Sequence, residues 1–183
     1  MLITGDATAR PLKKAIFAGG CFWCMQPPFD QVPGVMATTV GYTGGDKPNP
    51  TYEEVSNGRT GHLEAIEVSY DPDATDYNQL LSIFWQTIDP TDTGGQFADQ
   101  GVQYKTAIFY QDEDQRKGAE ASKNTLAASG RFKKPIVTQI LPARPFYPAE
   151  EEHQKYYKKN VLHYQLYKKG SGREDYLKQT WGQ

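Results

Sequence analysis

The segment Lys14-Ala-Ile-Phe-Ala-Gly-Gly-Cys-Phe-Trp-Cys24 joins an apolar run to two glycines and two cysteines. The apolar run, residues 14–18, predicts a β-strand, and the glycine pair ends it. A helical segment is expected to follow, with Pro27-Pro28 either within its first turns or kinking it. This strand-turn-helix junction would place Cys21 at a helix N-terminus.

Cys21 is the candidate nucleophile of this junction. Unpaired N–H groups and the positive end of the helix dipole stabilise a thiolate, so we expect the pKa of Cys21 to lie below the ordinary value of about 8.5. Cys24 lies three residues further on the same helix face, close enough to attack a sulfur oxidised at Cys21, and is the candidate resolving cysteine. Phe22 and Trp23 put an aromatic pair beside the thiol, which suits a small apolar group or a thioether.

The spacing of the two cysteines leaves other interpretations open. A disulfide between them would close a very short loop and would hardly restrict the unfolded chain, so it is no structural staple. In a reducing compartment such a pair is more often redox-active or metal-binding than architectural. Zinc would need four ligands, and His62, His153 and His163 do not supply the usual close second pair. Two small buried apolar residues are the remaining structural alternative.

The rest of the chain alternates short strands with helices. Strands are expected at residues 35–40, 63–70, 104–110 and 135–141, helices at 76–88, 112–129 and 149–160, and one short helical turn near 52–55. Asp76 is a candidate N-cap, and Glu151 and Lys155 are spaced to pair along the last helix. The β-α-β-β-α-β order predicts a two-layer α+β fold with helices on one face of the sheet, long loops and additional helices.

Glu64 is the second candidate catalytic residue. Alternate side chains of a strand point to the same face, so Glu64 lies in line with Ile66, Val68 and Tyr70 on the apolar side. Burial there would raise its pKa and keep a proton available near neutral pH, as a general acid requires. A carboxylate that stays hydrated at the strand end fits the pattern equally well. The neighbouring His62 is expected to be a structural hydrogen-bonding residue.

Length and charge limit the organisation and the partners. The 183 residues fit one domain, with residues 1–12 as an N-terminal extension and about 160–183 as a C-terminal tail without cysteine. The formal net charge of -2 gives no general attraction to nucleic acid or to anionic membranes. No stretch approaches the roughly 20 apolar residues that span a bilayer, and no apolar run typical of a signal peptide is visible. A monomeric cytoplasmic protein is expected, unless a leader has been removed.

A series of short motifs accompanies the cysteine pair. They are Gly20-Cys-Phe-Trp-Cys24, Gly41-Tyr-Thr-Gly-Gly45, Pro50-Thr-Tyr-Glu-Glu-Val55, Gly58-Arg-Thr-Gly-His62 with Glu64, Gly101-Val-Gln-Tyr104 and Pro145-Phe-Tyr-Pro-Ala-Glu150. Through these motifs the chain resembles the type A peptide methionine sulfoxide reductases over roughly residues 15–157. The Gly-Cys-Phe-Trp run is highly specific, and the family order of the other motifs makes coincidence untenable.

This resemblance implies an α/β plait with a ferredoxin-like core and the reduction of methionine S-sulfoxide, free or in proteins, to methionine. It matches Cys21 to the nucleophile and Glu64 to the acid that protonates the sulfoxide oxygen. The other residues matched to the site are Tyr52 and Tyr104, whose hydroxyls would bind that oxygen, Phe22 and Trp23, which would receive the substrate methyl group, and Asp99, which would help to bind substrate and order the site.

The chemistry of the residues and the resemblance imply one mechanism. Attack of the Cys21 thiolate on the sulfoxide sulfur builds negative charge on oxygen, which a protonated carboxylic acid flanked by two phenols would stabilise. Methionine leaves, Cys21 becomes a sulfenic acid, and Cys24 condenses with it to a disulfide that thioredoxin or a similar dithiol reduces. The thiols carry the electrons, so no metal, flavin or nicotinamide cofactor is expected.

Two departures from the family pattern stand out. Gln26 occupies a position where many members have Glu, and a small effect is expected because Glu64 is present. Many members also carry resolving cysteines in the C-terminal tail, which here has none, so Cys24 is the sole internal candidate. The tail residues Tyr164, Tyr167 and Trp181 are expected to pack on the body of the protein and to bind no ligand.

Two other functions remain as alternatives. A thioredoxin-like dithiol-disulfide oxidoreductase also has two cysteines at this spacing after a strand, but Phe-Trp between them and Glu64 would have no role in it. Reduction of insulin without sulfoxide turnover would favour it. A non-enzymatic module could bind methionine-like ligands through its aromatic residues, and would keep its biological effect without Cys21.

Overall fold

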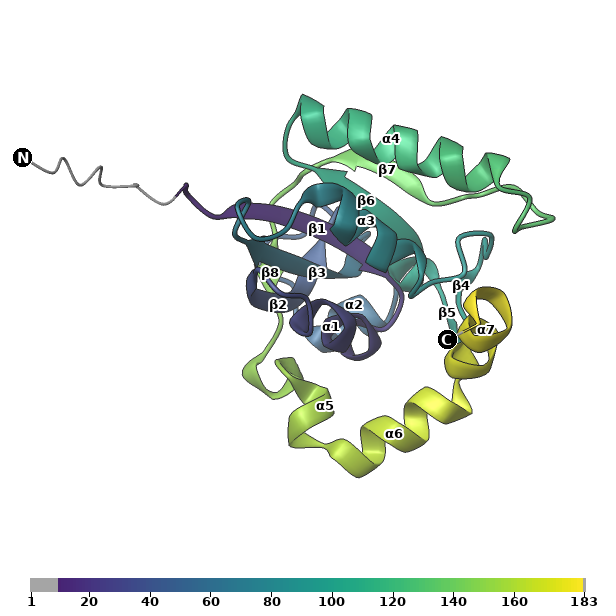
Figure 1. The fold of residues 1–183 in the computed structure, drawn as a ribbon. Helices are drawn as coiled ribbons and strands as arrows, with labels where there is room; N and C mark the ends of the chain where they lie inside the picture. Colours follow the sequence, from purple (N-terminus) through teal and green to yellow (C-terminus); the bar gives the residue numbers. More distant parts are fainter. Residues whose placement is uncertain (1–9, 183) are drawn as a thin grey trace, which may run out of the picture.

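The computed structural model describes residues 10–182, and a six-stranded mixed sheet of order β7-β6-β1-β3-β2-β8 forms its centre (Figure 1). The strands are β1 (Lys13–Gly19), β2 (Val35–Thr43), β3 (Leu63–Tyr70), β6 (Thr106–Tyr110), β7 (Gln139–Pro142) and β8 (Tyr147–Pro148). Strand β1 lies between β3 and β6 and is antiparallel to both, whereas β7 joins β6 in parallel. A separate hairpin pairs β4 (Gly95–Gln96) with β5 (Asp99–Gln100).

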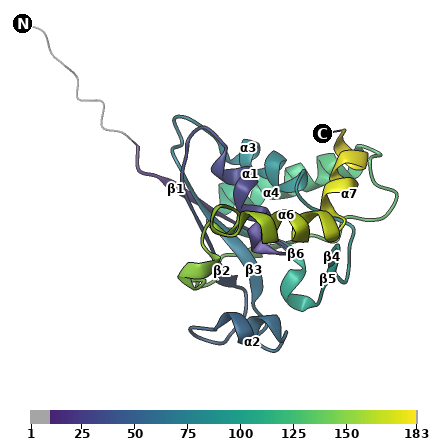
Figure 2. The same cartoon turned by 90° about the horizontal axis from the view of Figure 1, so that it is seen from below.

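Helices cover the sheet and continue beyond it. The α-helices are α1 (Phe22–Asp30), α2 (Tyr52–Ser56), α3 (Tyr77–Trp85), α4 (Glu113–Ala128), α5 (Tyr156–Lys159), α6 (Val161–Gly170) and α7 (Arg173–Trp181), with 3-10 turns η1 (Val102–Tyr104) and η2 (Glu151–His153). Helix α1 contacts β2 and β3, α3 contacts β1, and α4 contacts β6 and β7. Helices α5, α6 and α7 curve past α1 and return toward the β4–β5 hairpin (Figures 1 and 2).

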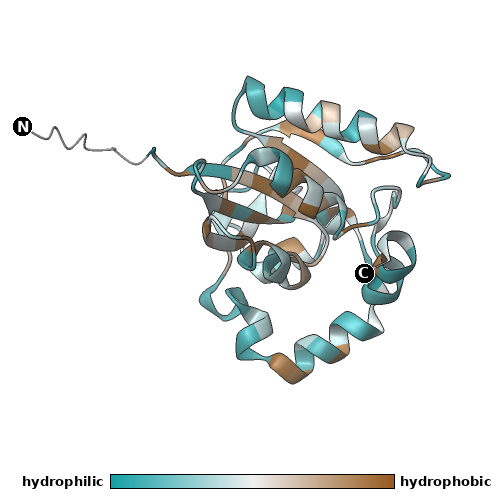
Figure 3. Ribbon diagram, viewed as in Figure 1, coloured by the Kyte–Doolittle hydropathy of each residue, from teal (hydrophilic) through white to brown (hydrophobic). Residues whose placement is uncertain are grey.

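The main core lies between the sheet and the helices α1, α3 and α4. Phe17 of β1 stacks on Phe29 of α1 and Phe84 of α3, with ring centroids 5.3 and 5.0 Å apart. Neighbouring β1 residues face the other side of the sheet, where Ile16 forms a smaller cluster against which Phe146 packs. Hydrophobic residues accordingly concentrate on the central strands, whereas α4 and α7 are mostly hydrophilic (Figure 3). The strand alternation of the sequence thus separates two packed faces.

Several predicted elements are confirmed. Strand β3 occupies residues 63–70, the short helical turn is α2, and a helix follows Gly19-Gly20. Asp76 caps α3, as predicted, and Asp112, which was not singled out as a cap, does the same for α4; each carboxylate accepts from a backbone N–H of the first turn. These signals are local, because a cap and its target are three residues apart.

Other predicted boundaries are wrong. Strand β2 continues to Thr43, because Gly41 pairs with β3 and with β8. Tyr104 belongs to η1, and β6 begins only at Thr106. Helix α3 ends at Trp85, and β7 is confined to residues 139–142. Pro27 and Pro28 lie beyond the first turn of α1, which includes both of them.

The helix predicted at residues 149–160 is broken into η2 and α5. Gln154 is extended because its side-chain amide hydrogen-bonds both the N–H and the C=O of Val40 in β2. Lys155 then adopts the left-handed conformation, with φ of 54°. The predicted Glu151–Lys155 pair is therefore absent: Lys155 pairs with Asp30, and Glu151 pairs with Lys159.

Helix α7 anchors the C-terminal segment to the β1–α1 junction. The Arg173 side chain is 3% exposed and donates to the carbonyls of Gly19 and Thr87 at 3.0 and 2.6 Å. Between residues 10 and 182 no helix combines the length and the hydropathy needed to cross a bilayer.

Candidate active site

The junction of β1 and α1 positions the first cysteine. Gly20 has φ of +81°, and a Cβ on it would lie 2.6 Å from Gln96 Cβ, so glycine is required for both conformation and space. Cys21 follows as the N-cap of α1, and its carbonyl accepts from the N–H groups of Cys24 and Met25. Cys21 is only 6% exposed.

Glu64 of β3 lies beside this helix start. Its carboxyl group is 2% exposed, and Oε2 accepts from the Phe22 N–H at 3.0 Å. Burial raises the pKa of Glu64 to about 8, and the Phe22 N–H opposes the rise only in part. Of the two alternatives left open by the sequence, the buried carboxyl group is the one that the structure shows, because the strand turns residue 64 toward α1.

The two tyrosines and the aspartate gather around the same carboxyl group from three other segments. Burial, followed by the charge of Glu64, raises the pKa of Tyr52 to about 12 and also raises the pKa of Tyr104. Asp99 on β5 accepts a hydrogen bond from the Tyr167 hydroxyl of α6. The hydroxyl groups of Tyr52 and Tyr104 therefore stay protonated at neutral pH and can donate hydrogen bonds.

The aromatic pair after Cys21 is enclosed by other rings. Phe22 is fully buried, with its ring centroid 5.8 Å from that of Tyr42. Trp23 is half-buried, and the ring of Tyr156 stacks on it with centroids 4.0 Å apart and an interplanar angle of 10°. The Trp23 indole N–H donates to His153 Nδ1 at 3.1 Å.

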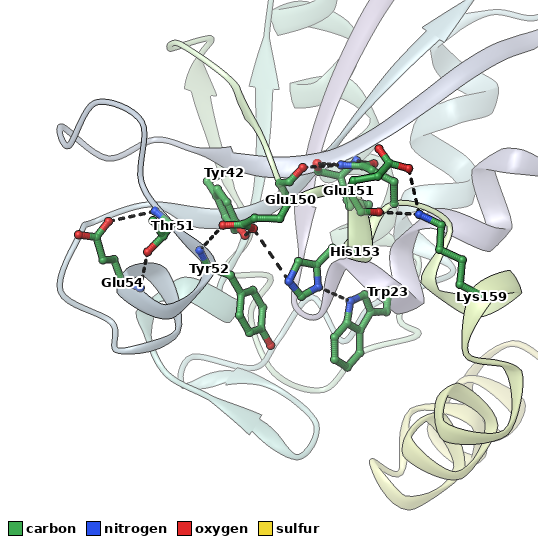
Figure 4. Close-up of polar contacts among 12 residues, drawn as sticks. Trp23, Tyr42, Thr51, Tyr52, Glu54, Glu150, Glu151, His153 and Lys159 are labelled. Atoms are coloured by element: carbon green, nitrogen blue, oxygen red, sulfur yellow. Dashed lines mark hydrogen bonds and ion pairs between the residues drawn. The ribbon is translucent and has the colours of Figure 1, made fainter.

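A carboxylate-centred network fixes α2 against this aromatic group (Figure 4). Glu150 accepts from the Tyr42 hydroxyl and from the Tyr52 N–H, each at 2.8 Å. Burial opposes ionisation of Glu150, but these donors and its own N–H lower its pKa below the ordinary value. Tyr52 also stacks on His153, with ring centroids 4.2 Å apart. The network holds the Tyr52 ring in place.

The two thiols differ in a way that the sequence did not predict. Burial raises the pKa of Cys21 well above its ordinary value, and the neighbouring Cys24 and the charge of Glu64 act in the same direction. The pKa of Cys24 is lowered to about 7, first by a hydrogen bond from the Cys21 thiol and then by the charges of Arg173 and Lys168.

The expectation of a low pKa for Cys21 is therefore wrong. The Cys21 side chain receives no capping hydrogen bond from α1, and the Phe22 N–H donates to Glu64. Burial removes water from the thiol without replacing it with a helix donor, so the dipole is outweighed.

The tail contributes residues that sequence reasoning missed. Tyr167 was expected only to pack on the body, yet its hydroxyl bonds Asp99 and interacts with the Cys21 thiol. Trp181 packs against the main core, and Tyr164 is buried. His153 and Glu150 were also missed as organisers of the aromatic group. No local pattern signals these contacts, because the partners lie far apart in the sequence.

Other expectations at the site are settled by individual contacts. His62 is a structural residue, as predicted: it accepts from the Gly45 N–H and contacts the Lys47 carbonyl. Gln26 is fully buried, with its amide donating to Thr38 and accepting from the Lys155 N–H. Within residues 10–182 there is no group of three or more His, Cys, Asp or Glu side chains that could hold a metal ion.

Comparison with known proteins gives the family. Residues 13–183 match the family model described as peptide methionine sulfoxide reductase. The chain belongs to this family. The peptide methionine sulfoxide reductase MsrA of Bacillus licheniformis is 58% identical over 174 residues, covering 95% of this chain and 96% of its own, and that of Bacillus subtilis is 58% identical over 92% and 95%. Family membership makes the protein an oxidoreductase.

Two solved structures of this family share the fold. Methionine sulfoxide reductase A of Corynebacterium diphtheriae is 36% identical with a TM-score of 0.73, covering 85% of this chain and 78% of its own. Mxr1 of Saccharomyces cerevisiae in reduced form is 29% identical with a TM-score of 0.77, covering 85% and 91%. The mixed α/β architecture with a central sheet is thus common to the peptide methionine sulfoxide reductases compared.

Proposed function

We propose that the protein reduces methionine S-sulfoxide, free or in proteins, to methionine, with Cys21 as nucleophile and Glu64 as general acid. The observation that carries this proposal is the contact of the buried Glu64 carboxyl group with the N–H of Phe22, the residue after Cys21. With a pKa of about 8, this group keeps its proton at neutral pH beside the thiol that would attack.

The first half-reaction transfers oxygen to Cys21. The Cys24 thiolate, hydrogen-bonded to the Cys21 thiol, accepts its proton as Cys21 Sγ attacks the sulfoxide sulfur. Glu64 gives its proton to the sulfoxide oxygen, and the Tyr52 and Tyr104 hydroxyls stabilise the charge that develops there. Methionine leaves reduced by two electrons, and Cys21 is left as a sulfenic acid.

The second half-reaction returns the electrons. Cys24 Sγ attacks the Cys21 sulfenic sulfur, the hydroxyl group leaves as water, and a Cys21–Cys24 disulfide forms. Two thiols of thioredoxin or a similar dithiol protein then reduce this disulfide by exchange. The first turn of α1 supports the step, since it already brings the two thiols into hydrogen-bonding contact.

Substrate recognition and the boundaries of the unit belong to the same proposal. Phe22 and Trp23 would receive the methyl group, and Asp99 would help to bind substrate and order the site through Tyr167, whose ring contacts Trp23. Residues 1–183 would act as a single catalytic domain on an α/β plait, consistent with the order β6-β1-β3-β2 at the centre of the sheet. The cytoplasmic location and the monomeric state stay predictions.

Turnover of separated methionine sulfoxide epimers with a thioredoxin system tests this function. We expect methionine from the S epimer and none from the R epimer. In a single turnover without reductant, Cys21→Ser should release no methionine. Reduction of insulin without sulfoxide turnover would instead favour a dithiol-disulfide oxidoreductase, and substantial methionine release by Cys21→Ser would remove Cys21 as the nucleophile.

A further inference from the structure

A cavity lined in part by residues of α6 and α7 reaches Cys24. It has a volume of about 380 Å³, and its walls include Cys24, Pro28, Ile83, Tyr164, Lys168 and Arg173. Cys21, Glu64 and the aromatic residues proposed to bind substrate do not line it. Cys24 thus lines a cavity that the residues of the proposed sulfoxide site do not share.

The charged groups of this cavity are cationic. Among residues 10–182, neither Lys168 nor Arg173 has a carboxylate within ion-pair distance; the Arg173 guanidinium donates to two carbonyl oxygens and to Met25 sulfur and lies over the Phe97 ring. The negative charge of Asp99 raises the pKa of Cys24, whereas the two cations lower it, but Asp99 does not line the cavity. In the reduced protein the Cys24 thiolate is a counter-charge to both cations, because their positive charges lower the pKa of its thiol.

Oxidation removes that counter-charge. When Cys24 Sγ enters a disulfide with Cys21 it can no longer carry a negative charge, while Lys168 and Arg173 remain positive. The net charge of the groups around the cavity therefore rises by up to one unit in the disulfide form, which is the form that a reductant must attack. A buried, uncompensated cation attracts an anion strongly, because little water screens it.

Because Cys24 shares this cavity with Lys168 and Arg173, we propose that the cavity is a binding site for low-molecular-weight thiols that carry a carboxylate. Such thiols would reach the disulfide of the oxidised protein through it. The carboxylate lies against Lys168 and Arg173, and the apolar stem lies along Pro28 and Ile83. The volume of about 380 Å³ is large enough to hold a thiol of this size. The site rests on the proposed function only in using the Cys21–Cys24 disulfide.

The exchange at this site conserves electrons. The thiolate attacks Cys24 Sγ, the disulfide bond breaks, and its electron pair leaves on Cys21, which takes up a proton. A second thiolate attacks the ligand sulfur of the mixed disulfide and releases Cys24. Two small thiols are oxidised to one disulfide, and one protein disulfide is reduced.

The test compares thiols that differ in charge. Full-length protein is oxidised with diamide, so the disulfide forms without sulfoxide chemistry, and its reduction is followed by rapid mixing with 3-mercaptopropionate, 2-mercaptoethanol or cysteamine. The rate for each small thiol is corrected for the fraction of it that is ionised and for the intrinsic nucleophilicity of its thiolate. We expect the anionic thiol to react about tenfold faster than the cationic one, with a saturable dependence on its concentration.

Charge reversal locates the effect. Lys168→Glu should remove the preference for 3-mercaptopropionate, whereas Lys169→Glu, an exposed neighbour that does not line the cavity, should retain it. Early acid quenching with peptide mapping should find the mixed disulfide on Cys24. Equal corrected rates for all three thiols, equal losses in the two lysine variants, or an adduct on Cys21 would each overturn the proposal. A missing methionine burst from the reduced protein, measured before the diamide treatment, would instead count against the proposed sulfoxide reduction.

Discussion

Glu64 is a carboxyl group that the fold keeps away from water while giving it one donor, the Phe22 N–H. Desolvation and the nearby Asp99 and Cys24 favour the protonated form, and a single neutral donor cannot reverse them. The same residue is therefore a proton donor near neutral pH and a source of instability once it ionises. Both consequences can be measured.

The proton of Glu64 should set the upper pH limit of sulfoxide reduction. In single turnover, the wild-type rate should fall as pH rises through about 8, because the ionised group cannot donate. Glu64→Gln keeps the shape but has no proton to give, so its rate should be roughly 10²- to 10³-fold lower at pH 7 and should lack this limb. Rapid-quench methionine release measures both, and an unchanged rate in Glu64→Gln would assign the acid elsewhere.

Glu64 should also cost stability as pH rises. Its folded pKa of about 8 lies above the ordinary 4.5, so the folded state holds a proton that the unfolded chain releases. Wild-type stability should decline between these two values relative to Glu64→Gln, by roughly 3 kcal/mol from pH 5 to pH 8, and should level off above. Urea unfolding of both proteins over this range checks the trend. Parallel curves would show that the carboxyl group is hydrated in solution.

At the scale of single elements, the first turn of α1 combines the two thiols. Cys21 occupies the N-cap position, its carbonyl accepts from the Cys24 N–H in the first turn, and the helix repeat brings the two side chains together. A short element therefore supplies attack and resolution, while β3 supplies the acid.

Replacing the second thiol should separate the two half-reactions. Cys24→Ser should still release close to one methionine per protein, more slowly because the acceptor of the Cys21 proton is gone, and then stall as a Cys21 sulfenic acid, because no internal thiol can condense with it. Thioredoxin-driven turnover should fall sharply, and dithiothreitol should restore part of it. Mass spectrometry after one turnover should find a disulfide in the wild type and a sulfenic-acid adduct in the variant. Wild-type rates with thioredoxin would contradict a resolving role for Cys24.

At the scale of the whole molecule, the C-terminal segment completes a site whose other parts come from the first 104 residues. Helix α6 brings Tyr167 to Asp99, and α7 inserts Arg173 below the β1–α1 junction. The tail thereby places the Tyr167 ring and hydroxyl group and the Arg173 cation near Cys21 and Cys24, which lie close to the N-terminal end of the sequence.

Removing the Arg173 cation should loosen this assembly. Arg173→Met leaves the buried carbonyls of Gly19 and Thr87 without their donor, at a cost of about 2 kcal/mol. It should also raise the pKa of Cys24 above about 7, because a stabilising charge is lost. Urea unfolding and the pH dependence of alkylation measure the two effects. Lys178→Met, exposed on the same helix, is the control, and equal behaviour of the two variants would mean that the tail is not anchored by Arg173.

The sequence by itself determined the features that depend on near neighbours. Strand β3 keeps its predicted bounds because its alternation is local, and Asp76 and Asp112 act as caps because each bonds a residue three positions on. The same alternation turned Glu64 to the buried face. The glycine pair before Cys21 required a turn, whatever packed against it.

Tertiary structure alone decided the rest. Residues 149–160 carry a helical pattern, yet the bonds of Gln154 to Val40 outweigh it, because two hydrogen bonds to a sheet edge stabilise an extended residue. The position of Tyr167 and the reversed order of the cysteine pKa values depend on burial and on charges more than 100 residues away in the chain, such as Arg173. Local sequence patterns do not predict such contacts, because solvent exclusion and long-range pairing arise only once the segments have packed together.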